Sequence, residues 1–387
     1  MRVKIKNGKL IMDRIHEGKN LYLAEGKIAA ITTEELPCDK EIDAGGNFVS
    51  PGFIDIHTHG GGGADFMDGG VEPIEQAAQM HLAHGTTTIF PTTLASSFPV
   101  LKSSVLDIGR AMQSKKRLPH IAGTHLEGPY FSLNQAGAQN PDYITDPIKA
   151  EYEELLEAGK GIIKRWSFAP ERKGSVEFCE ALLKNGVVPS IAHSDAVYED
   201  VKRVYDAGCR LVTHLYSGMS TIVRRGGFRF LGVVESSYLL DEMNVETIAD
   251  GLHLPPELLR LVYQQKGPSK VCLVTDSMRG AGMPAGPSLL GRKEECTPCI
   301  IEDGVAKLMD RSAFAGSVAT TDRLVRTCVQ KAGISIVDAV RMMTETPAKN
   351  MGLSHVGKLA EGYDADILVF DQDINIQQVI LSGDSVG

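Results

Sequence analysis

The stretch PGFIDIHTHGGGG, residues 51–63, joins an apolar strand pattern to two histidines spaced two residues apart. Side chains two residues apart in a strand point to the same face, so Asp55, His57 and His59 share one face. Neutral histidine is a common ligand of zinc and similar divalent cations, and the glycines that follow let the backbone turn away without crowding. The stretch therefore predicts a metal site at the end of a strand. From these residues alone, two histidines that bind nothing are the alternative.

Strand and helix patterns alternate from this stretch to about Met278, and probable β-hairpin sequence then runs to about Ala313. Helical stretches such as 175–186 and 198–208 lie between most of the strands. Eight strands in such alternation are typical of a (β/α)8 TIM-type barrel, which makes the chain an α/β protein. The eight strand segments are 53–59, 86–93, 120–128, 162–171, 187–195, 209–217, 244–254 and 270–278.

The two ends of the chain share a different pattern, with short strands separated by turns. Asn7-Gly8 and Glu25-Gly26 are predicted as hairpin turns. We expect residues 1–50 plus 356–387 to form one small, discontinuous β-sandwich domain, and residues 51–355 to form the catalytic barrel.

The composition is that of a globular protein of 387 residues, with 43% apolar residues and a formal net charge of −9. This charge argues against binding to nucleic acid, and no apolar run reaches the ~18 residues of a membrane span. The N-terminus has no apolar segment typical of a signal peptide, and the seven cysteines are an odd number, so a reducing cytoplasm is expected. Cys296 and Cys299 form a lone CxxC, interpreted as ordinary thiols rather than a metal or redox site.

Polar residues recur where the predicted strands end, which is where barrel enzymes carry their chemistry. A single histidine there is more often a satisfied core or rim residue than a ligand. A buried cluster of imidazoles and carboxylates from several strands would be costly without a cation, so the pattern predicts a divalent metal. The residues are His57, His59, His125, Glu127, His193, Asp195, His214, Asp250, His253 and Asp276.

This arrangement resembles the amidohydrolase superfamily and, within it, the family of N-acetylglucosamine-6-phosphate deacetylases. The resemblance covers nearly the whole chain, and the order of the motifs makes it specific. They are THLEGPYF (124–131), Gly137-Ala138, IAHSDA (191–196), THLYSGMS (213–220), ADGLHL (249–254), LVTDSM (273–278), FAGSVATTDRLVR (314–326) and GYDADILVFD (362–371).

The resemblance implies removal of the acetyl group from N-acetyl-D-glucosamine 6-phosphate, giving D-glucosamine 6-phosphate and acetate in amino-sugar catabolism. It assigns Glu127, His193 and His214 as main metal ligands, and lets His57 and His59 hold a second ion. Zn²⁺ suits these ligands, but iron, manganese or cobalt and a count of one or two ions stay open.

The general base and acid implied by the resemblance is Asp276. A zinc-type ion lowers the pKa of its water to about 7, and Asp276 would take the water's proton and give it to the leaving amine. An N-cap for the following segment is the alternative role for this aspartate.

Substrate contacts also follow from the resemblance. Arg225 matches a phosphate-binding arginine that reaches in from the other subunit of a homodimer, although Arg224 and Arg229 are close enough to replace it. A solvated basic loop is the alternative for this segment. The other implied contacts are Ala138, Gln139, Ser217, Gly218, Asp250, Gly251, Leu252, His253, Phe314, Ala315 and Gly316.

Three departures from the family pattern all concern substrate and spare the metal ligands. Gln139 replaces a histidine expected near the scissile carbonyl, Ser217-Gly218 replaces Asn-Ala, and residues 224–232 lack an expected Arg-Glu-Pro-Gly. We therefore expect intact hydrolytic machinery, with another N-acyl amino sugar such as N-acetylgalactosamine 6-phosphate, or an unphosphorylated one, as the alternative substrate. A barrel that has lost catalysis is a third interpretation, which retention of the ligands and Asp276 opposes.

Overall fold

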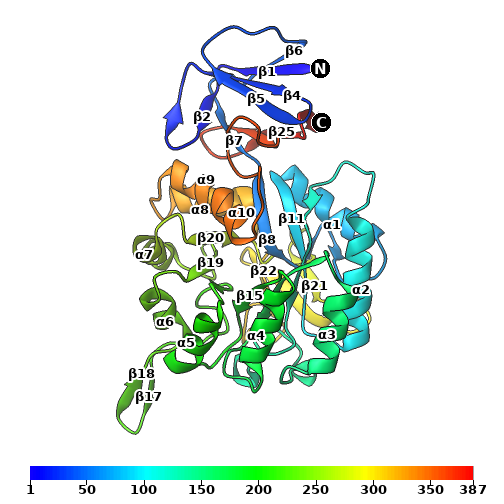
Figure 1. Ribbon diagram of the computed structural model, residues 1–387, viewed down its shortest axis with the longest axis vertical. Coiled ribbons are helices and arrows are strands. Elements are labelled where there is room, and N and C mark those ends of the chain that lie inside the picture. The colour runs from blue at the N-terminus through cyan, green and yellow to red at the C-terminus, as the bar shows by residue number, and fades with distance from the viewer. Residues whose placement is uncertain (387) are drawn as a thin grey trace.

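A computed structural model describes residues 1–386, and its main feature is a nearly closed barrel of eight parallel strands (Figure 1). All eight predicted strands are present, and a short strand, β12 (His120–Ile121), lies beside the second. Their inward and outward faces are both covered, so most of these strands are buried along their whole length. In barrel order they are β8 (Phe53–Thr58), β11 (Thr86–Thr93), β13 (Thr124–Glu127), β14 (Ile163–Phe168), β15 (Val188–Ile191), β16 (Leu211–Val212), β19 (Asn244–Ile248) and β20 (Val271–Val274).

The first and last strands meet through backbone hydrogen bonds at their carboxyl ends. The amide of Asp276 donates to the carbonyl of His57 over 2.9 Å, and the amide of His59 donates to the carbonyl of Ser277 over 2.7 Å. These bonds place His57 and His59 directly beside Asp276, the predicted general base.

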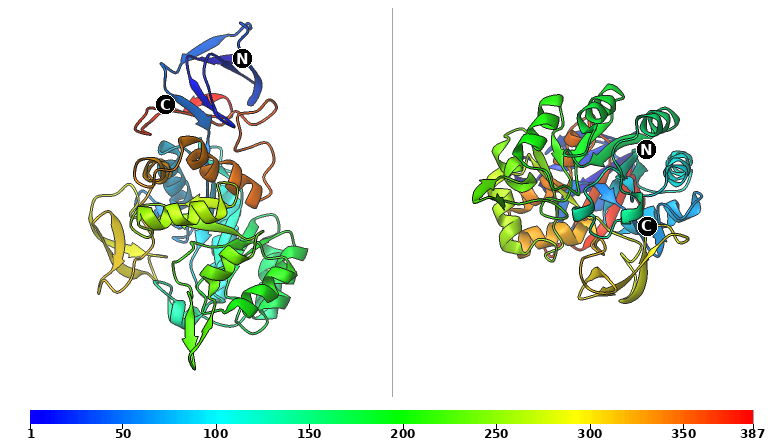
Figure 2. Two further views of the ribbon diagram at one scale, coloured as in Figure 1. Left: turned by 90° about the vertical axis from the view of Figure 1, so that its left-hand side faces the viewer. Right: turned by 90° about the horizontal axis from the view of Figure 1, so that it is seen from below.

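Helices surround the strands, as the view along the barrel shows (Figure 2). Their apolar faces pack on the strands in one large core that includes Trp166, Phe168 and Phe178. The helices are α1 (Glu72–Ala83), α2 (Phe98–Ala111), α3 (Lys149–Ala158), α4 (Ser175–Lys184), α5 (Tyr198–Ala207), α6 (Val233–Leu239), α7 (Pro256–Lys266), α8 (Thr321–Gln330), α9 (Ile336–Met343) and α10 (Glu345–Asn350).

Two sheets from both ends of the chain form the small β domain at the top of Figure 1. A separate apolar cluster, including Ile5, Leu23 and Ile367, lies among their strands. One sheet has the order β5-β4-β1-β6 and the other β26-β25-β24-β7-β2-β3. The strands are β1 (Arg2–Lys6), β2 (Lys9–Ile11), β3 (Ile15–His16), β4 (Asn20–Ala24), β5 (Lys27–Thr32), β6 (Lys40–Asp43), β7 (Phe48–Pro51), β24 (Ile367–Phe370), β25 (Ile376–Leu381) and β26 (Asp384–Val386).

The two predicted hairpin turns have different outcomes. Glu25-Gly26 joins the antiparallel pair β4–β5 with both residues at positive φ, so that prediction is confirmed. The prediction for Asn7-Gly8 is wrong, because β1 and β2 belong to different sheets and the dipeptide carries the chain between them. The division into 1–50 plus 356–387 and 51–355 stays a prediction, and Gly387 lies outside the described residues.

Since β7 leads almost directly into β8, the small domain lies at the amino end of the barrel and the strands' carboxyl ends face away from it (Figure 1). Near that opposite end, the hairpin β17 (Val223–Arg225) and β18 (Phe228–Phe230) projects from the molecule. The predicted hairpin after Met278 is a three-stranded antiparallel sheet of β21 (Gly286–Leu290), β22 (Thr297–Glu302) and β23 (Val305–Leu308).

Among residues 1–386, no helix combines the length and the apolar character that crossing a membrane requires.

The remaining short elements lie in loops at the carboxyl ends of the barrel strands. They are β9 (Gly60–Gly61), β10 (Ala64–Asp65), η1 (Leu133–Gln135) and η2 (Pro141–Tyr143).

Candidate metal centre and active site

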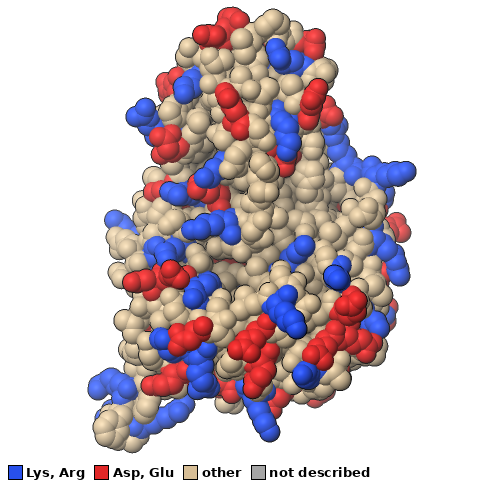
Figure 3. Space-filling model, viewed as in Figure 1, with Lys and Arg blue, Asp and Glu red and all other residues tan. Residues whose placement is uncertain are grey.

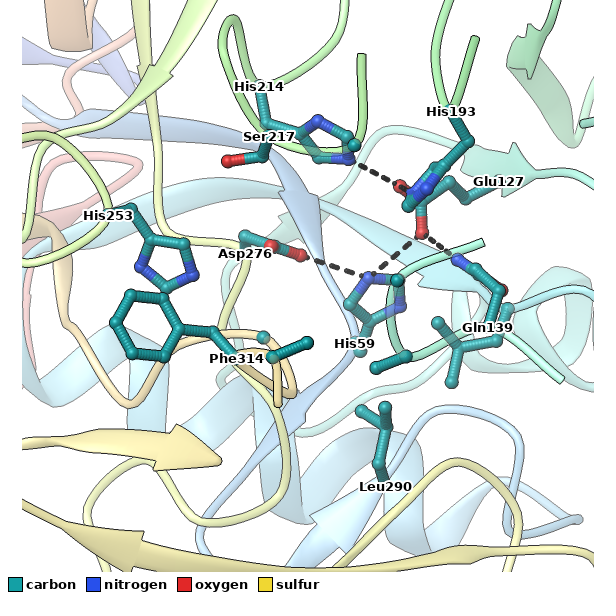
Figure 4. Close-up of a pocket in the computed structure, with 16 residues that line it drawn as sticks. His59, Glu127, Gln139, His193, His214, Ser217, His253, Asp276, Leu290 and Phe314 are labelled. Atoms are coloured by element: carbon teal, nitrogen blue, oxygen red, sulfur yellow. Dashed lines mark hydrogen bonds and ion pairs between the residues drawn. The ribbon is translucent and has the colours of Figure 1, made fainter. Parts of the chain in front are cut away.

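A cavity of about 220 Å³ opens at the carboxyl ends of the barrel strands (Figure 4). Most of the predicted site residues line it, and they come from five strand ends and from loops far apart in the sequence. Four further residues, Leu94, Gly137, Leu290 and Ala313, complete its wall and were not predicted. The predicted residues in the wall are His59, Glu127, Ala138, Gln139, His193, His214, Ser217, Gly218, His253, Asp276, Phe314 and Gly316.

Three of these residues have a left-handed backbone, which is rare for residues other than glycine. The φ angles are +44° at His193, +24° at His214 and +48° at Asp276. Each follows closely on a buried strand, and the unusual φ turns the chain sharply at the rim of the barrel. Strained backbone of this kind clusters at functional sites, because the surrounding structure must hold it in place.

Glu127 is the centre of the site, with four imidazole rings around its carboxylate. The Nε2 atoms of His57, His193 and His214 lie 3.5, 3.3 and 2.9 Å from Oε1, and Nε2 of His59 lies 3.4 Å from Oε2. Figure 4 shows several of these side chains converging on the carboxylate. Residues from four different barrel strands and their ends therefore meet at one buried carboxylate.

The second nitrogen of three rings is held by a group that can only accept a hydrogen bond. Nδ1 of His57 donates to Glu246 over 3.3 Å, Nδ1 of His59 to the Thr92 carbonyl over 3.3 Å, and Nδ1 of His193 to the Gln135 carbonyl over 2.7 Å. With Nδ1 engaged in this way, each ring directs its Nε2 toward the centre. This is the orientation in which histidine binds a metal ion.

The electrostatics of the centre favour positive charge. Burial opposes ionisation of Glu127, but His57 and the hydrogen bonds of His193 and His214 hold the pKa of its carboxyl well below the usual value. Burial likewise lowers the pKa of His57, yet Glu127 and Asp276 raise it to about 9 overall. The carboxylates of Glu127 and Asp276 both lie within 3.5 Å of imidazole nitrogens, so their negative charge favours a cation at this point.

The donor set fits a divalent cation. His57, Glu127 and His214 place ligand atoms within 4.8 Å of one another, and so do His57, His59 and Asp276. Nε2 of His57, which belongs to both groups, is buried and has no hydrogen-bond partner among the described residues. Imidazole and carboxylate ligands are those that zinc and its neighbours prefer.

Two charged residues beneath the centre were missed by the sequence interpretation. Glu246 on β19 and Arg165 on β14 are fully buried and form an ion pair inside the barrel. Arg165 also donates to Ser190 Oγ over 3.0 Å and to Thr213 Oγ1 over 2.7 Å. Because Glu246 also accepts from His57, this pair supports a predicted ligand. The alternation in NVETI could have shown that Glu246 faces inward, but the sequence alone could not show its partner.

Gly218 has a steric reason to be glycine. Its φ is +56°, and an added Cβ would lie 2.8 Å from His193 Nδ1 and 3.1 Å from the Gln135 carbonyl oxygen. A side chain here would press on the hydrogen bond that orients His193. The packing around His193, a predicted ligand, therefore explains why position 218 holds glycine instead of the expected Ala.

Several predicted substrate contacts lie outside the cavity wall. Arg225 lies on the exposed hairpin β17–β18, where Arg224 and Arg229 also lie and where Figure 3 shows Lys and Arg side chains gathered. Asp250 instead orients His253, accepting from its Nδ1 over 2.8 Å, and His253 packs on the ring of Phe314. The other predicted residues absent from the wall are His57, Gly251, Leu252 and Ala315.

Comparison with known proteins agrees with this geometry. The model of the amidohydrolase family matches residues 48–386. The N-acetylglucosamine-6-phosphate deacetylase of Lysinibacillus sphaericus is 31% identical over 368 residues, covering 95% of this chain and 93% of the relative. The N-acetylgalactosamine-6-phosphate deacetylase of Escherichia coli O157:H7 is 29% identical over 366 residues, covering 94% and 93%.

Solved structures give the same result. A mutant N-acetyl-D-glucosamine-6-phosphate deacetylase from Mycobacterium smegmatis, in complex with N-acetyl-D-glucosamine-6-phosphate, superposes with a TM-score of 0.90 at 30% identity, covering 100% of this chain and 98% of that one. The N-acetylglucosamine-6-phosphate deacetylase of Pasteurella multocida gives 0.92 at 27%, covering 100% of both. The extent of the family match and the shared barrel lead to one conclusion: the chain belongs to the amidohydrolase family.

Proposed function

We propose that the protein is a metal-dependent hydrolase that removes the acetyl group from N-acetyl-D-glucosamine 6-phosphate, giving D-glucosamine 6-phosphate and acetate. The observation that carries the proposal is the convergence of four imidazoles on Glu127, with Asp276 beside them. Relatives and solved structures with this activity in their names support the choice of substrate. Free thiols at all seven cysteines support a reducing, cytoplasmic location.

Glu127, His193 and His214 would hold one divalent ion, for which Zn²⁺ is the best match to the ligands. His57 and His59 offer a second position next to Glu127. The chemistry that such an ion supplies is polarisation of the amide carbonyl and a lowered pKa for the attacking water.

Asp276 is the group that moves the proton. Burial raises the pKa of its carboxyl, but His57 and His59 lower it to about 2 overall, so the carboxylate is ionised at neutral pH. Its Oδ1 lies 3.1 Å from His59 Nε2 and 3.4 Å from His57 Nε2, which fixes its position at the cavity wall. It can therefore accept the proton of the attacking water and return it to the leaving amine.

The sugar would lie against the wall formed by His253 and Phe314, whose ring centroids are 4.7 Å apart. Ala138, Gly316, Ser217 and Gly218 line the same cavity. The remaining predicted contacts would act through neighbouring wall residues. Asp250, Gly251 and Leu252 precede His253 in the chain, and Ala315 lies between Phe314 and Gly316.

Arg225 would meet the phosphate from a second copy of the chain, because the hairpin that carries it projects from the molecule (Figure 1) and Arg225 does not line the cavity of its own chain. This makes a homodimer part of the proposal. Arg225→Ala should raise KM for the phosphorylated sugar about tenfold and leave the unphosphorylated sugar unaffected. Arg224→Ala and Arg229→Ala are compared with it, and a larger effect in either would assign the phosphate contact to that arginine. A monomer in sedimentation would count against the dimer.

N-acetylgalactosamine 6-phosphate is the second candidate substrate. Gln139 and Ser217 stand where the family pattern differs, and both line the cavity. The Escherichia coli relative that is 29% identical carries this activity in its name.

The decisive experiment is acetate release by the purified protein, with Zn²⁺ added and with a chelator. Metal-dependent release from N-acetylglucosamine 6-phosphate, faster than from the galactosamine isomer or the free sugars, is expected. Equal rates on phosphorylated and free sugars would contradict the phosphate assignment. Faster release from the galactosamine isomer would favour the second candidate.

A further inference from the structure

Gln139 makes two hydrogen bonds that leave no freedom in the orientation of its side-chain amide. The backbone amide of Ala95 donates to its Oε1 over 2.8 Å, and its Nε2 donates to Glu127 Oε2 over 2.7 Å. A backbone N–H can only donate and an ionised carboxylate can only accept, so the amide cannot be reversed. Gln139 is also buried, with 5% of its surface exposed.

The two oxygens of Glu127 consequently have different surroundings. Oε1 faces His193, His214 and His57, at 3.3, 2.9 and 3.5 Å. Oε2 faces His59 at 3.4 Å and receives the Gln139 donor (Figure 4). An ion on the Oε2 side would therefore meet a side-chain amide N–H that is already bonded to the oxygen it needs.

We propose that Gln139 makes this a site with one strongly bound ion, by weakening the second position formed by His57, His59 and Asp276. Within this group His59 faces Oε2, the oxygen to which Gln139 already donates, so the Gln139 N–H would compete with an ion for that oxygen. The Gln139 oxygen cannot serve as a substitute ligand, because the Ala95 amide holds it away. This inference rests on the proposed metal dependence and makes Gln139 a positioning residue that sets the number of ions.

The same hydrogen bond changes what Gln139 can do for substrate. One of its two N–H groups is bonded to Glu127, so at most one remains for an acyl oxygen in the cavity. Its main partner is the metal-binding carboxylate, and its effect on hydrolysis is expected to pass through that carboxylate.

The test is titration of Zn²⁺ into the metal-stripped full chain, followed by calorimetry, with elemental analysis of the equilibrated protein. Wild type should bind one ion tightly and a second at least about tenfold more weakly. Gln139→Met and Gln139→Leu both remove the donor without adding a charge, and each should tighten the second ion about tenfold while leaving the first unchanged. Gln76→Met is the matched control, since the Gln76 amide donates to the Gly62 carbonyl and does not reach Glu127.

Two ions of equal affinity in wild type, or an unchanged second affinity in both Gln139 variants, would overturn the inference while leaving deacetylation intact. A wild-type chain that binds no ion would overturn the inference together with the metal dependence on which it rests. Circular dichroism of each variant separates a changed affinity from a failure to fold.

Discussion

Asp276 and His57 lie at the ends of the last and first strands of the barrel, and the Asp276 amide donates to the His57 carbonyl over 2.9 Å. Residues far apart in the chain are thus fixed beside each other by a main-chain bond that a side-chain substitution does not remove. The carboxylate of Asp276 can be altered while its backbone, and the position of the HxH motif, stay as they are.

Asp276→Asn should therefore fold normally and lose about 10²- to 10⁴-fold in kcat for acetate release, because an amide cannot accept the water's proton. The measurement is kcat beside a urea unfolding curve and the ion content under the same conditions. An Asp276→Asn variant as active as wild type would contradict the assignment of the general base.

Gly218→Ala should disturb His193, since the added Cβ would lie 2.8 Å from its Nδ1. The expected result is at least about tenfold weaker binding of the first ion, measured by competition with a metal-sensitive dye. Gly226→Ala is the matched control: its φ of +55° is almost the same as the +56° of Gly218, but nothing lies within 4 Å of its added Cβ. Equal effects in the two variants would mean that backbone strain alone, and not contact with His193, explains the loss.

Arg165→Met should lower the free energy of unfolding by about 3–5 kcal/mol, because it leaves Glu246 buried without its cationic partner. Equilibrium unfolding in urea gives this quantity. Lys102→Met, which breaks the exposed pair with Glu154, should cost no more than about 1 kcal/mol. A loss in Arg165→Met as small as in Lys102→Met would show that the buried pair adds little to stability.

Lys266 should make the protein more stable as the pH rises from about 8 to 10.5. Burial lowers the pKa of its amine to about 8 from 10.5, while its Nζ donates to the Ser237 carbonyl over 2.8 Å. Between these values the unfolded chain holds a proton that the folded chain has released, so the unfolding free energy rises with pH.

The comparison that checks this is urea unfolding of wild type and Lys266→Met at pH 7, 9 and 10.5. The stability of wild type relative to the variant should increase along the series. Lys160→Met, at an exposed position elsewhere in the chain, should run parallel to wild type. A constant difference between wild type and Lys266→Met would show that the amine titrates normally.

The barrel and the ring of imidazoles could be predicted because both depend on local patterns. Each strand is a short apolar run, and the predicted ligands lie at or just after the ends of such runs, as in the HTH of β8 or His214 after β16. Arg165 and Glu246 escaped prediction because they lie within strands, and only closure of the barrel brings them together.

Other features depended on what a local pattern does not contain. Asn7-Gly8 indicates a bend, but the dipeptide does not determine which sheet the next strand joins. Gln139 could be placed near the site from its loop, yet its bond to Glu127 required the fold of residues 128–146. The reach of Arg225 depends on a second chain, which one sequence does not describe.

The left-handed backbone at His193, His214 and Asp276 has a consequence for engineering this barrel. Glycine adopts such conformations freely, so glycine at these three positions would relax the chain while deleting two predicted metal ligands and the predicted general base. Stability and catalytic turnover therefore place opposite demands on these three residue positions. A triple-glycine version would be free of this backbone strain but inert, and any route to a more stable working enzyme must take its gains elsewhere in the chain.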